Sequence, residues 1–413
     1  MKDIPLLLNR EFEKTFGLGV VPHLYFAPGR INLIGEHIDY NGGKVLPCNI
    51  DRGIWVLCRP NDYGELRFAS LDFPNNSPAQ AFHRHDLPLL TPNALNKDWT
   101  IYPLAMLKTL ESISHKLKQG VDLLYGSNLP IANGLSSSHA LMIVTALAIC
   151  PYLGLDTSQE TVRLKLAQLS QIAENKYVGV QSGLMDGFVI SLGQKNKAIL
   201  LSCHSVEYEH IDMRLDDAEL WIIDSGNSRE LSGSAYNQRV QECQEALAQI
   251  NLTISSVSSS LEIINSPLQC LCELDYQSWL SVQPYIKDPI LFKRAQHVIS
   301  ENQRVVLASK ALRDGNMRLL GELFTQSHNS LRDDYAVTGS ALDTLAKLCM
   351  EQSDCLGARM TGAGFGGCFI ALFQAGSAQK CLTQIADMYH QQQGLALQAF
   401  PYKSQTASQL INS

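Results

Sequence analysis

The chain has 413 residues, a length that predicts two or three domains at roughly 150 residues per domain. Its 33 basic and 40 acidic side chains give a formal net charge of −7, so the chain has no overall basic excess to neutralise the phosphates of DNA or RNA. Hydrophobic residues make up 45% and charged residues 18%, the balance of a globular protein rather than a disordered one. We expect the whole chain to fold and to bind no nucleic acid.

The apolar segments are too short for a secretion signal or a membrane span. The run at 4–8 is soon followed by the charged Arg10, and the longest stretch, Ala140 to Cys150, ends at Pro151. The eleven cysteines are odd in number and irregularly spaced, and no Cys-x-x-Cys pair indicates zinc or redox chemistry. We therefore expect a cytoplasmic protein with reduced thiols and no membrane partner.

The first half of the chain alternates between strand-like and helix-like patterns. Apolar runs between Asn, Asp and Gly turns predict strands, and apolar residues three and four apart predict helices. Thr157 and Glu160 form a capping-box pattern that opens a helix to about residue 175. The apolar face of this helix comprises Leu164, Ala167, Leu169 and Ile172. The other predicted elements are sheet at 24–70, helix at 99–110, strand at 121–125 and helix at 136–150.

The second half is predicted to be largely helical. Helical spacing extends from 236 to 348, and we expect the serine-rich run at 255–260 to interrupt it as a surface loop. A domain boundary near residue 205 divides the chain into 1–205 and 206–413. The remaining predicted elements are strands at 198–202 and 220–223, a glycine-dense segment at 357–367, a strand at 368–373 and a helix near 379–391.

Residues 29–43, GRINLIGEHIDYNGG, form the first segment that indicates chemistry. Their density of polar donors and acceptors suits a polyhydroxylated ligand, because each bound hydroxyl needs a partner to offset its desolvation. A polar loop with turn glycines is the alternative.

Residues 129–140, LPIANGLSSSHA, run directly into the apolar helix. A turn rich in Gly and Ser at a helix N-terminus presents free N–H groups and the positive end of the dipole, which together bind phosphate. The segment is no Walker A loop, since the Lys-Ser or Lys-Thr of that motif is missing. A simple serine N-cap is the alternative.

Two further segments are informative only in combination. Glu174 and Asp186 are acidic residues among apolar neighbours, where a carboxylate accepts a hydroxyl proton or caps a helix. Gly362, Gly364 and Gly367 match the G-x-G-x-x-G spacing, but a strand rather than a helix follows, which argues against a dinucleotide-binding unit. We expect this glycine loop to let backbone approach a ligand or another loop.

Together these segments resemble the GHMP small-molecule kinases, and within them the galactokinase family. The resemblance extends from about 24 to 373, with weaker matches at 234–239 and 327–335. It implies an α+β, two-domain GHMP kinase fold, with an N-terminal ribosomal-protein-S5-like α/β domain and a C-terminal ferredoxin-like α+β domain. It also implies an ATP-dependent sugar 1-kinase whose active site lies between the domains.

The resemblance assigns roles residue by residue. Asp186 would be the catalytic carboxylate facing the C1 hydroxyl, with Arg30 beside it to stabilise negative charge. Ser138 and Glu174 would coordinate Mg²⁺. The residues implied to bind sugar are Glu36, His37, Asp39, Gly183 and Tyr236. Those implied to bind ATP are Gly134, Leu135, Ser136, Ser137 and Ser138, with Trp99 and Tyr102 in an adenine pocket or, alternatively, in a helix core.

Several positions depart from the family pattern and leave the sugar open. Ile38, Ala132, His139 and Gly187 replace the usual Thr, Gly, Ala and Gln, and 224–229 leans toward relatives acting on arabinose. We expect His139 to point away from the nucleotide. Because Glu36 would repel a substrate carboxylate, a neutral hexose is favoured, galactose first. L-arabinose, galacturonate, N-acetylgalactosamine and a non-catalytic sugar and ATP sensor are the alternatives, and the chain is compatible with a monomer.

Overall fold

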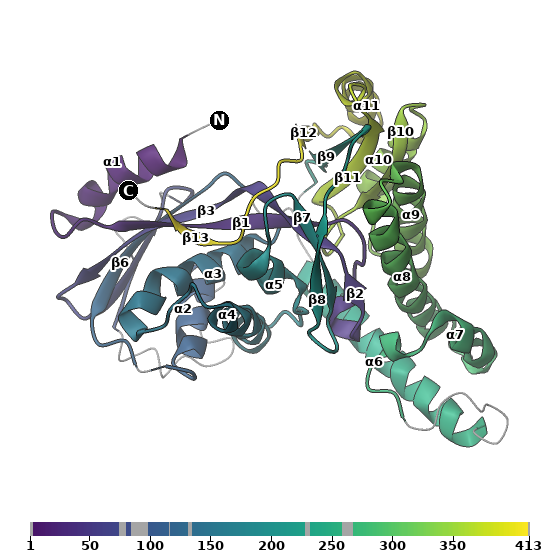
Figure 1. The fold of residues 1–413 in the computed structure, drawn as a ribbon, viewed down its shortest axis with the longest axis horizontal. Coiled ribbons are helices and arrows are strands. Elements are labelled where there is room, and N and C mark those ends of the chain that lie inside the picture. Colours follow the sequence, from purple (N-terminus) through teal and green to yellow (C-terminus); the bar gives the residue numbers. More distant parts are fainter. Residues whose placement is uncertain are drawn as a thin grey trace.

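The computed structural model describes residues 3–73, 80–83, 98–114, 116–130, 134–227, 232–257 and 267–411. Helices and strands are mixed along the chain, as the α+β prediction requires. Figure 1 shows the strands of the first half on one side of the molecule and the long helices of the second half on the other.

The largest sheet has six strands and carries the N-terminal half. Its neighbours are antiparallel except for β4 and β6, which run parallel. A register shift between Pro28 and Arg30 bends β1 where the signature segment begins. The strand order is β13 (Gln409–Ile411), β1 (His23–Asn32), β3 (Pro47–Asn61), β6 (Gly120–Ser127), β4 (Glu65–Ser70) and β5 (Gln80–His83).

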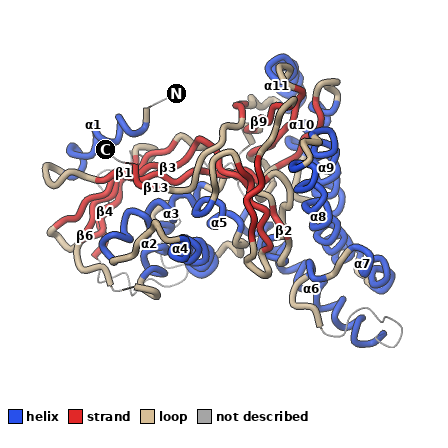
Figure 2. The backbone as a smooth tube through the Cα atoms, in the orientation of Figure 1, coloured by secondary structure: helices blue, strands red, loops and turns tan. Residues whose placement is uncertain are grey.

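Helices cover both faces of this sheet, as Figure 2 shows. On one face, α1 buries side chains spaced four apart, Ile4, Leu8, Phe12 and Phe16, against Leu24, Leu57 and Leu124. The opposite face packs against apolar helices of the main core. The helices of this half are α1 (Ile4–Phe16), α2 (Ile101–Leu110), α3 (Ser137–Ile149), α4 (Glu160–Ala173) and α5 (Met185–Leu192).

A four-stranded antiparallel sheet carries the second half, and Figure 1 shows helices beside it. Its order is β10 (Cys355–Met360), β11 (Cys368–Gln374), β9 (Ala218–Asp224) and β12 (Gln398–Pro401). A third sheet has the order β2 (Lys44–Val45), β7 (Lys197–Ser202) and β8 (Tyr208–Asp212). The helices are α6 (Ser232–Val257), α7 (Tyr276–Val282), α8 (Pro289–Arg313), α9 (Met317–Ser330), α10 (Ser340–Met350) and α11 (Ala378–Gln393).

Most predicted elements are confirmed, and three local predictions are wrong. Helix α4 begins at Glu160 with Gln159 as its N-cap residue and no side-chain cap, so Thr157 lies two residues before the capping position. Ile172 is 45% exposed rather than on the apolar face. Helix α6 continues to Val257, and the rest of the serine-rich run lies outside the described residues. The start of the glycine-dense segment is the buried strand β10, while β8 was not predicted.

All eleven cysteines are free thiols, and eight of them are buried. Among the described helices, none is long and apolar enough to cross a membrane. The segment 140–149 is instead the buried part of α3, as predicted.

Candidate active site

One cavity of about 430 Å³ gathers nearly all the residues that the sequence singles out. Leu135 is the exception, because its side chain is buried and its carbonyl accepts the Arg30 backbone N–H at 3.1 Å. The predicted residues that line the cavity are Arg30, Glu36, His37, Asp39, Trp99, Tyr102, Gly134, Ser136, Ser137, Ser138, Glu174, Gly183, Asp186 and Tyr236.

A two-pronged ion pair joins β1 to the start of α5. Arg30 donates from Nε to Asp186 Oδ1 and from a terminal nitrogen to Oδ2, each at 2.8 Å. Its other terminal nitrogen donates to Gly134 O at 2.6 Å. Burial raises the pKa of Asp186, but Arg30, His139 and the Ser136 hydroxyl outweigh it, so the pKa lies below its usual value. Asp186 is therefore ionised at neutral pH while 20% of its side chain stays exposed.

The phosphate-loop prediction corresponds to a tight turn at the N-terminus of α3. Gly134 and Ser136 have φ of +82° and +61°, left-handed backbone that turns the chain into the helix. The Ser136 hydroxyl donates to Asp186 Oδ2. Gly362 of the third motif packs on this turn, since an added Cβ would lie 2.7 Å from Gly134 O. The glycine motif thus serves a close loop-to-loop approach, as predicted.

His139 does not point away from the site, and that prediction is wrong. Its side chain is 1% exposed, and Nδ1 lies 3.6 Å from Glu174 Oε2 and 3.9 Å from Asp186 Oδ2. The same Nδ1 lies 3.5 Å from the Ser138 hydroxyl, and the buried Nε2 has no hydrogen-bond partner in the described part of the chain. The apolar helix α3 places the imidazole on its inner face, directly behind both acids.

Asp39 faces the cavity from the short 3₁₀ helix Asp39–Asn41. Burial and the nearby Asp186 carboxylate raise the pKa of Asp39 to about 7. Gly183 leaves the room for this side chain, because an added Cβ would lie 2.1 Å from Asp39 Oδ2. Asn237 of α6 holds the neighbouring loop by accepting from the Gln181 N–H at 3.0 Å.

A hydrogen-bonded chain fixes His37, which has a φ of +64°. Its Nε2 lies 3.0 Å from the Ala363 carbonyl and its Nδ1 lies 2.8 Å from the Tyr40 hydroxyl. Since a carbonyl only accepts, Nε2 donates and Nδ1 accepts from Tyr40. The Tyr40 hydroxyl also lies 2.9 Å from that of Tyr335, and the His37 ring contacts Tyr236 at 5.4 Å between centroids.

Glu36 is held more tightly than any other predicted sugar ligand. Its carboxylate pairs with the fully buried Arg359 and accepts from Asn32 Nδ2 at 2.8 Å and from the Gly362 N–H at 2.9 Å. The Thr361 hydroxyl donates to it as well, at 3.2 Å. The Thr361 hydroxyl also faces the Asn32 carbonyl at 3.1 Å, so its one proton is shared, and Glu36 still forms part of the cavity wall.

Aromatic rings line the far end of the cavity. Trp99 stacks against Phe73 with an interplanar angle of 12° and meets Tyr125 edge-on. The buried Trp99 Nε1 has no hydrogen-bond partner among the residues that the structure describes. Tyr102 lies in the same wall, and burial raises its pKa to about 12. Both residues thus belong to the cavity as well as to the core.

Comparison with known proteins identifies the family. Sequence models match for the galactokinase galactose-binding signature at 10–60, the GHMP kinases N terminal domain at 102–194 and the GHMP kinases C terminal at 308–391. A galactokinase of Clostridium perfringens is 40% identical over 366 residues, 89% of each chain. The chain belongs to the galactokinase family. A second galactokinase, from Enterococcus faecalis, is 37% identical over 396 residues, 96% of each chain.

Solved structures of the galactokinase family and of more distant kinases share the fold. The structure of Lactococcus lactis galactokinase complexed with galactose matches with a TM-score of 0.90 at 34% identity, over 98% of this chain and 100% of that one. Methanococcus jannaschii mevalonate kinase, 18% identical, matches with a TM-score of 0.64 over 93% of this chain and 99% of that one. The predicted two-domain GHMP kinase fold is confirmed, and the chain is a sugar kinase.

The departures from the galactokinase family pattern lie mostly away from the cavity. Ile38 is completely buried, and Gly187 lets α5 approach α4, because an added Cβ would lie 2.2 Å from Ser170 Oγ. Residues 224–227 contact the glycine loop, with the Asn227 carbonyl accepting from the Gly367 N–H. Ala132 and residues 228–229 lie outside the described residues.

Sequence reasoning missed the residues that support the galactokinase signature from behind. His297 Nε2 of α8 donates to the Glu36 carbonyl at 3.1 Å, Glu301 Oε1 accepts from the Gly35 N–H at 3.0 Å, and Asn302 Oδ1 accepts from the Lys44 N–H at 2.9 Å. Burial raises the pKa of Glu301, but Arg304, His297 and Arg359 lower it further, to about 2. The sequence does show two polar residues, His297 and Glu301, four apart on a predicted helix. Nothing in the sequence indicates, however, that they contact residues 35–44.

Proposed function

We propose that this protein is a galactokinase, which transfers the γ-phosphoryl group of ATP to the C1 hydroxyl of D-galactose. The observation that carries the proposal is the Arg30–Asp186 pair. It opens into the cavity beside the N-terminus of α3, where residues of the sugar signature and of the phosphate loop form one wall.

Asp186 accepts the proton of the C1 hydroxyl, or stabilises that hydroxyl as it attacks. The low pKa of Asp186 keeps the carboxylate ready as an acceptor, and its exposed fraction faces the cavity. Arg30 orients the carboxylate through two hydrogen bonds and lies where negative charge develops. Phosphoryl transfer depends mainly on positioning and charge neutralisation, which this pair supplies without a covalent intermediate.

The sugar hydroxyls would contact Asp39, His37, Tyr236, the Gly183 backbone and Glu36. Asp39 and Tyr236 have the largest capacity for new hydrogen bonds, whereas both nitrogens of His37 are already engaged. Glu36 would contribute least, because Arg359, Asn32 and the Gly362 N–H already donate to its carboxylate.

ATP would bind with its phosphates on Gly134 to Ser138 and its adenine toward Trp99 and Tyr102. The free N–H groups and dipole of α3 favour anions, and the unpartnered Trp99 Nε1 offers a further donor. The Ser138 hydroxyl and Glu174 carboxylate both line the cavity and provide the hard oxygen donors that Mg²⁺ prefers. When bound, Mg²⁺ would neutralise phosphate charge.

The preference for a neutral sugar has a different basis from the one that the sequence suggests. Glu36 is neutralised by Arg359, so it would repel a substrate carboxylate only weakly. Asp39 and Asp186 instead both lie near Arg30, and together the two carboxylates leave negative charge in this part of the cavity. A uronate would meet that charge in poorly screened surroundings. Galactose is therefore favoured over galacturonate.

We also propose that the protein acts in the cytoplasm as a monomer and divides into two domains near residue 205. Its net charge of −7 supports the absence of a nucleic-acid partner. Light scattering after gel filtration would test the monomer, with a mass of 45.7 kDa expected.

The function is tested by ADP release with Mg-ATP across D-galactose, N-acetylgalactosamine, D-galacturonate, L-arabinose and mevalonate. Selective turnover of galactose is expected, with Asp186→Ala as the control for contaminating kinases. Selective turnover of another sugar would contradict the substrate and leave the reaction in place. ATP binding without turnover of any of them would contradict the reaction itself.

A further inference from the structure

The cysteines that are not fully buried gather at one place. Eight of the eleven cysteines are buried, and the other three are Cys203, Cys270 and Cys272. All three contact the end of the sugar signature at Gly42 and Gly43. An added Cβ on Gly42 would lie 2.3 Å from Cys270 Sγ, one on Gly43 would lie 2.8 Å from Cys272 Sγ, and the Cys203 N–H donates to Gly43 O at 3.0 Å.

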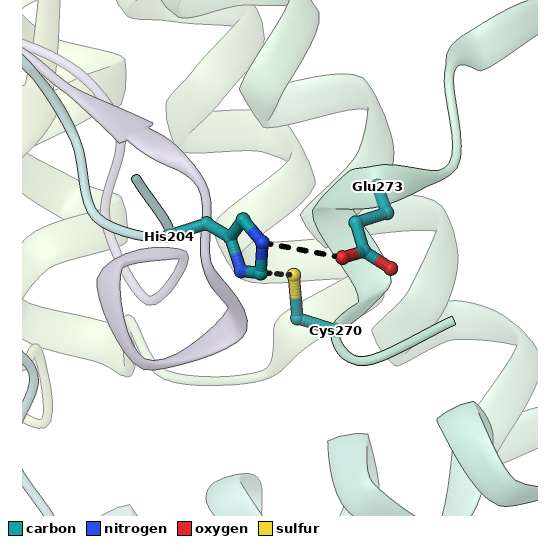
Figure 3. Close-up of side chains that lie close together, drawn as sticks. All are labelled: His204, Cys270 and Glu273. Carbon is teal, nitrogen blue, oxygen red and sulfur yellow. Dashed lines mark hydrogen bonds and ion pairs between the residues drawn. The ribbon is translucent and has the colours of Figure 1, made fainter. Parts of the chain in front are cut away.

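Beside this contact, three different donor types converge (Figure 3). His204 lies in the turn between β7 and β8, Glu273 belongs to the 3₁₀ helix Leu271–Glu273, and Cys270 is the N-cap residue of that helix. The imidazole Nε2 is 3.3 Å from Glu273 Oε1, and Nδ1 is 3.8 Å from Cys270 Sγ. One donor atom from each residue lies within 4.8 Å of the other two.

The three residues differ in how firmly they are held. The Gln269 N–H donates to Glu273 Oε2 at 2.7 Å, which fixes the carboxylate and leaves Oε1 toward His204. Cys270 is held between the His204 side chain and Gly42. The His204 side chain is 46% exposed, so its ring is free to turn one nitrogen inward and an ion has direct access from solvent.

We propose that His204, Cys270 and Glu273 form a binding site for Zn²⁺, separate from the phosphate-binding cavity. Nitrogen, sulfur and carboxylate donors are those that Zn²⁺ takes, at about 2.0–2.3 Å each, so neighbouring donor atoms need to move together by only a small distance. A fourth position would stay open to water. Mg²⁺ is disfavoured here, because it prefers oxygen donors in an octahedron.

Zinc at this site would restrain the end of the sugar signature, residues 39–43, through the segments that contact Gly42. His204 and Cys270 belong to separate segments that both contact Gly42, and Gly42 directly follows the 3₁₀ helix that carries Asp39. An ion bound to both segments limits how far they separate, and it thereby limits motion of 39–43. The proposal concerns metal binding and holds whichever sugar the protein phosphorylates.

The test is a Co²⁺ titration of the reduced, metal-free full chain, followed by absorption and carried out in excess Mg²⁺ to occupy oxygen sites. We expect a single ion with the charge-transfer absorption of a cobalt–thiolate bond, displaced by Zn²⁺. His204→Ala and Cys270→Ser should each weaken binding by on the order of tenfold or more. His390→Ala, which removes an exposed histidine on α11, is the matched control and should bind like the wild type.

Two results would overturn the site: no thiolate absorption in the wild type, or absorption that persists at full affinity in both ligand variants. His204→Ala keeps the test valid if Cys270→Ser fails to fold, because His204 is exposed. Hydrogen exchange tests the effect on the loop. Zn²⁺ should slow exchange of the Asn41, Gly42 and Gly43 amides, which donate to Ile38 and Asp39. Unchanged exchange of these amides would contradict the proposed restraint.

Discussion

Two arginine–carboxylate pairs lie within the same sugar and phosphate region, and they differ in what surrounds them. In the Arg30–Asp186 pair, 20% of the carboxylate side chain is exposed to the cavity. In the Arg359–Glu36 pair, the side chains are 0% and 1% exposed, and Arg359 also donates to the Leu33 carbonyl at 2.8 Å. The first pair is available to a substrate, while the second joins β10 to the signature loop.

The comparison shows that the role of an ion pair depends on whether its carboxylate is exposed to the cavity or fully buried. Both carboxylates occur in segments that the sequence marks as functional, and both have an arginine partner. The Asp186 carboxylate remains partly exposed beside the N-terminus of α3. The Glu36 carboxylate instead accepts hydrogen bonds from other residues of the protein. The following predictions distinguish a catalytic role for the Arg30–Asp186 pair from a structural role for the Arg359–Glu36 pair.

Arg359→Met should destabilise the protein most. It would leave the Glu36 carboxylate buried without its cation, which costs about 3–5 kcal/mol in comparable buried pairs. Urea unfolding measures the effect. Arg332→Met, which removes an arginine with a 42% exposed side chain, should change the free energy of unfolding by less than about 1 kcal/mol. Equal effects of the two substitutions would contradict the structural role of Arg359.

Gly183→Ala should raise KM for galactose by roughly tenfold, because the new Cβ displaces Asp39 and a hydrogen bond to a charged group contributes about 1.5–3 kcal/mol. Steady-state kinetics with saturating ATP measure it. In an Asp39→Ala background the same substitution should have little further effect. A full additional effect there would show that Gly183 does not act through Asp39.

The pH dependence of KM should report Asp39. Because the pKa of Asp39 is about 7, its carboxylate is fully ionised, and best able to accept hydrogen bonds from sugar hydroxyls, only above that pH. KM should therefore rise as pH falls below 7, by up to roughly tenfold per pH unit. Asp186 stays ionised across this range because its pKa is lowered. Asp39→Asn should abolish this pH dependence of KM. If KM in that variant changes with pH as it does in the wild type, another group is responsible.

The raised pKa of Asp39 affects stability in the opposite direction: rising pH favours sugar binding but lowers the stability of the fold. The folded pKa of Asp39 lies above the ordinary value of 3.8, so unfolding between these pH values releases a proton. This group therefore lowers the free energy of unfolding as pH rises toward 7, and Asp39→Asn should reduce that fall in urea titrations.

His139→Ala should have the smallest effect, a decrease in kcat of at most about tenfold. The imidazole lies 3.6 and 3.9 Å from the two carboxylates, too far for strong hydrogen bonds, so its loss mainly leaves space behind them. His139→Asn, which keeps a donor at a similar position, should recover part of the rate. A loss as large as that of Asp186→Ala would place His139 in the reaction itself.

The fold was largely predictable from the sequence because its core segments have clear periodicity. Helix α3 and strand β11 are examples, since both are nearly continuous apolar runs with turn residues before them. The start of α4 was mispredicted because Thr157 and Glu160 match a capping pattern whose hydrogen bonds the chain does not form. Strand β8 alternates polar and apolar residues too briefly for its pattern to stand out.

The site was predictable through motifs, but its electrostatics were not. The resemblance to the galactokinase family singled out Asp186, Arg30 and Asp39, and the fold brings them to one cavity. The burial of His139 depends on which side of α3 faces the acids, and the neutralisation of Glu36 depends on Arg359, 323 residues away. Such pairings arise only when β10 and the signature loop meet in space.

The central claim is that Asp186 acts on the sugar hydroxyl from within its pair with Arg30. The most direct measurement is the single-turnover rate of phosphoryl transfer to galactose in Asp186→Asn, with ATP, Mg²⁺ and galactose saturating. We predict a rate lower by on the order of 10²–10⁴ with galactose still bound, because the amide keeps the shape of the side chain but accepts no proton. A rate within about tenfold of the wild type would contradict this role for Asp186.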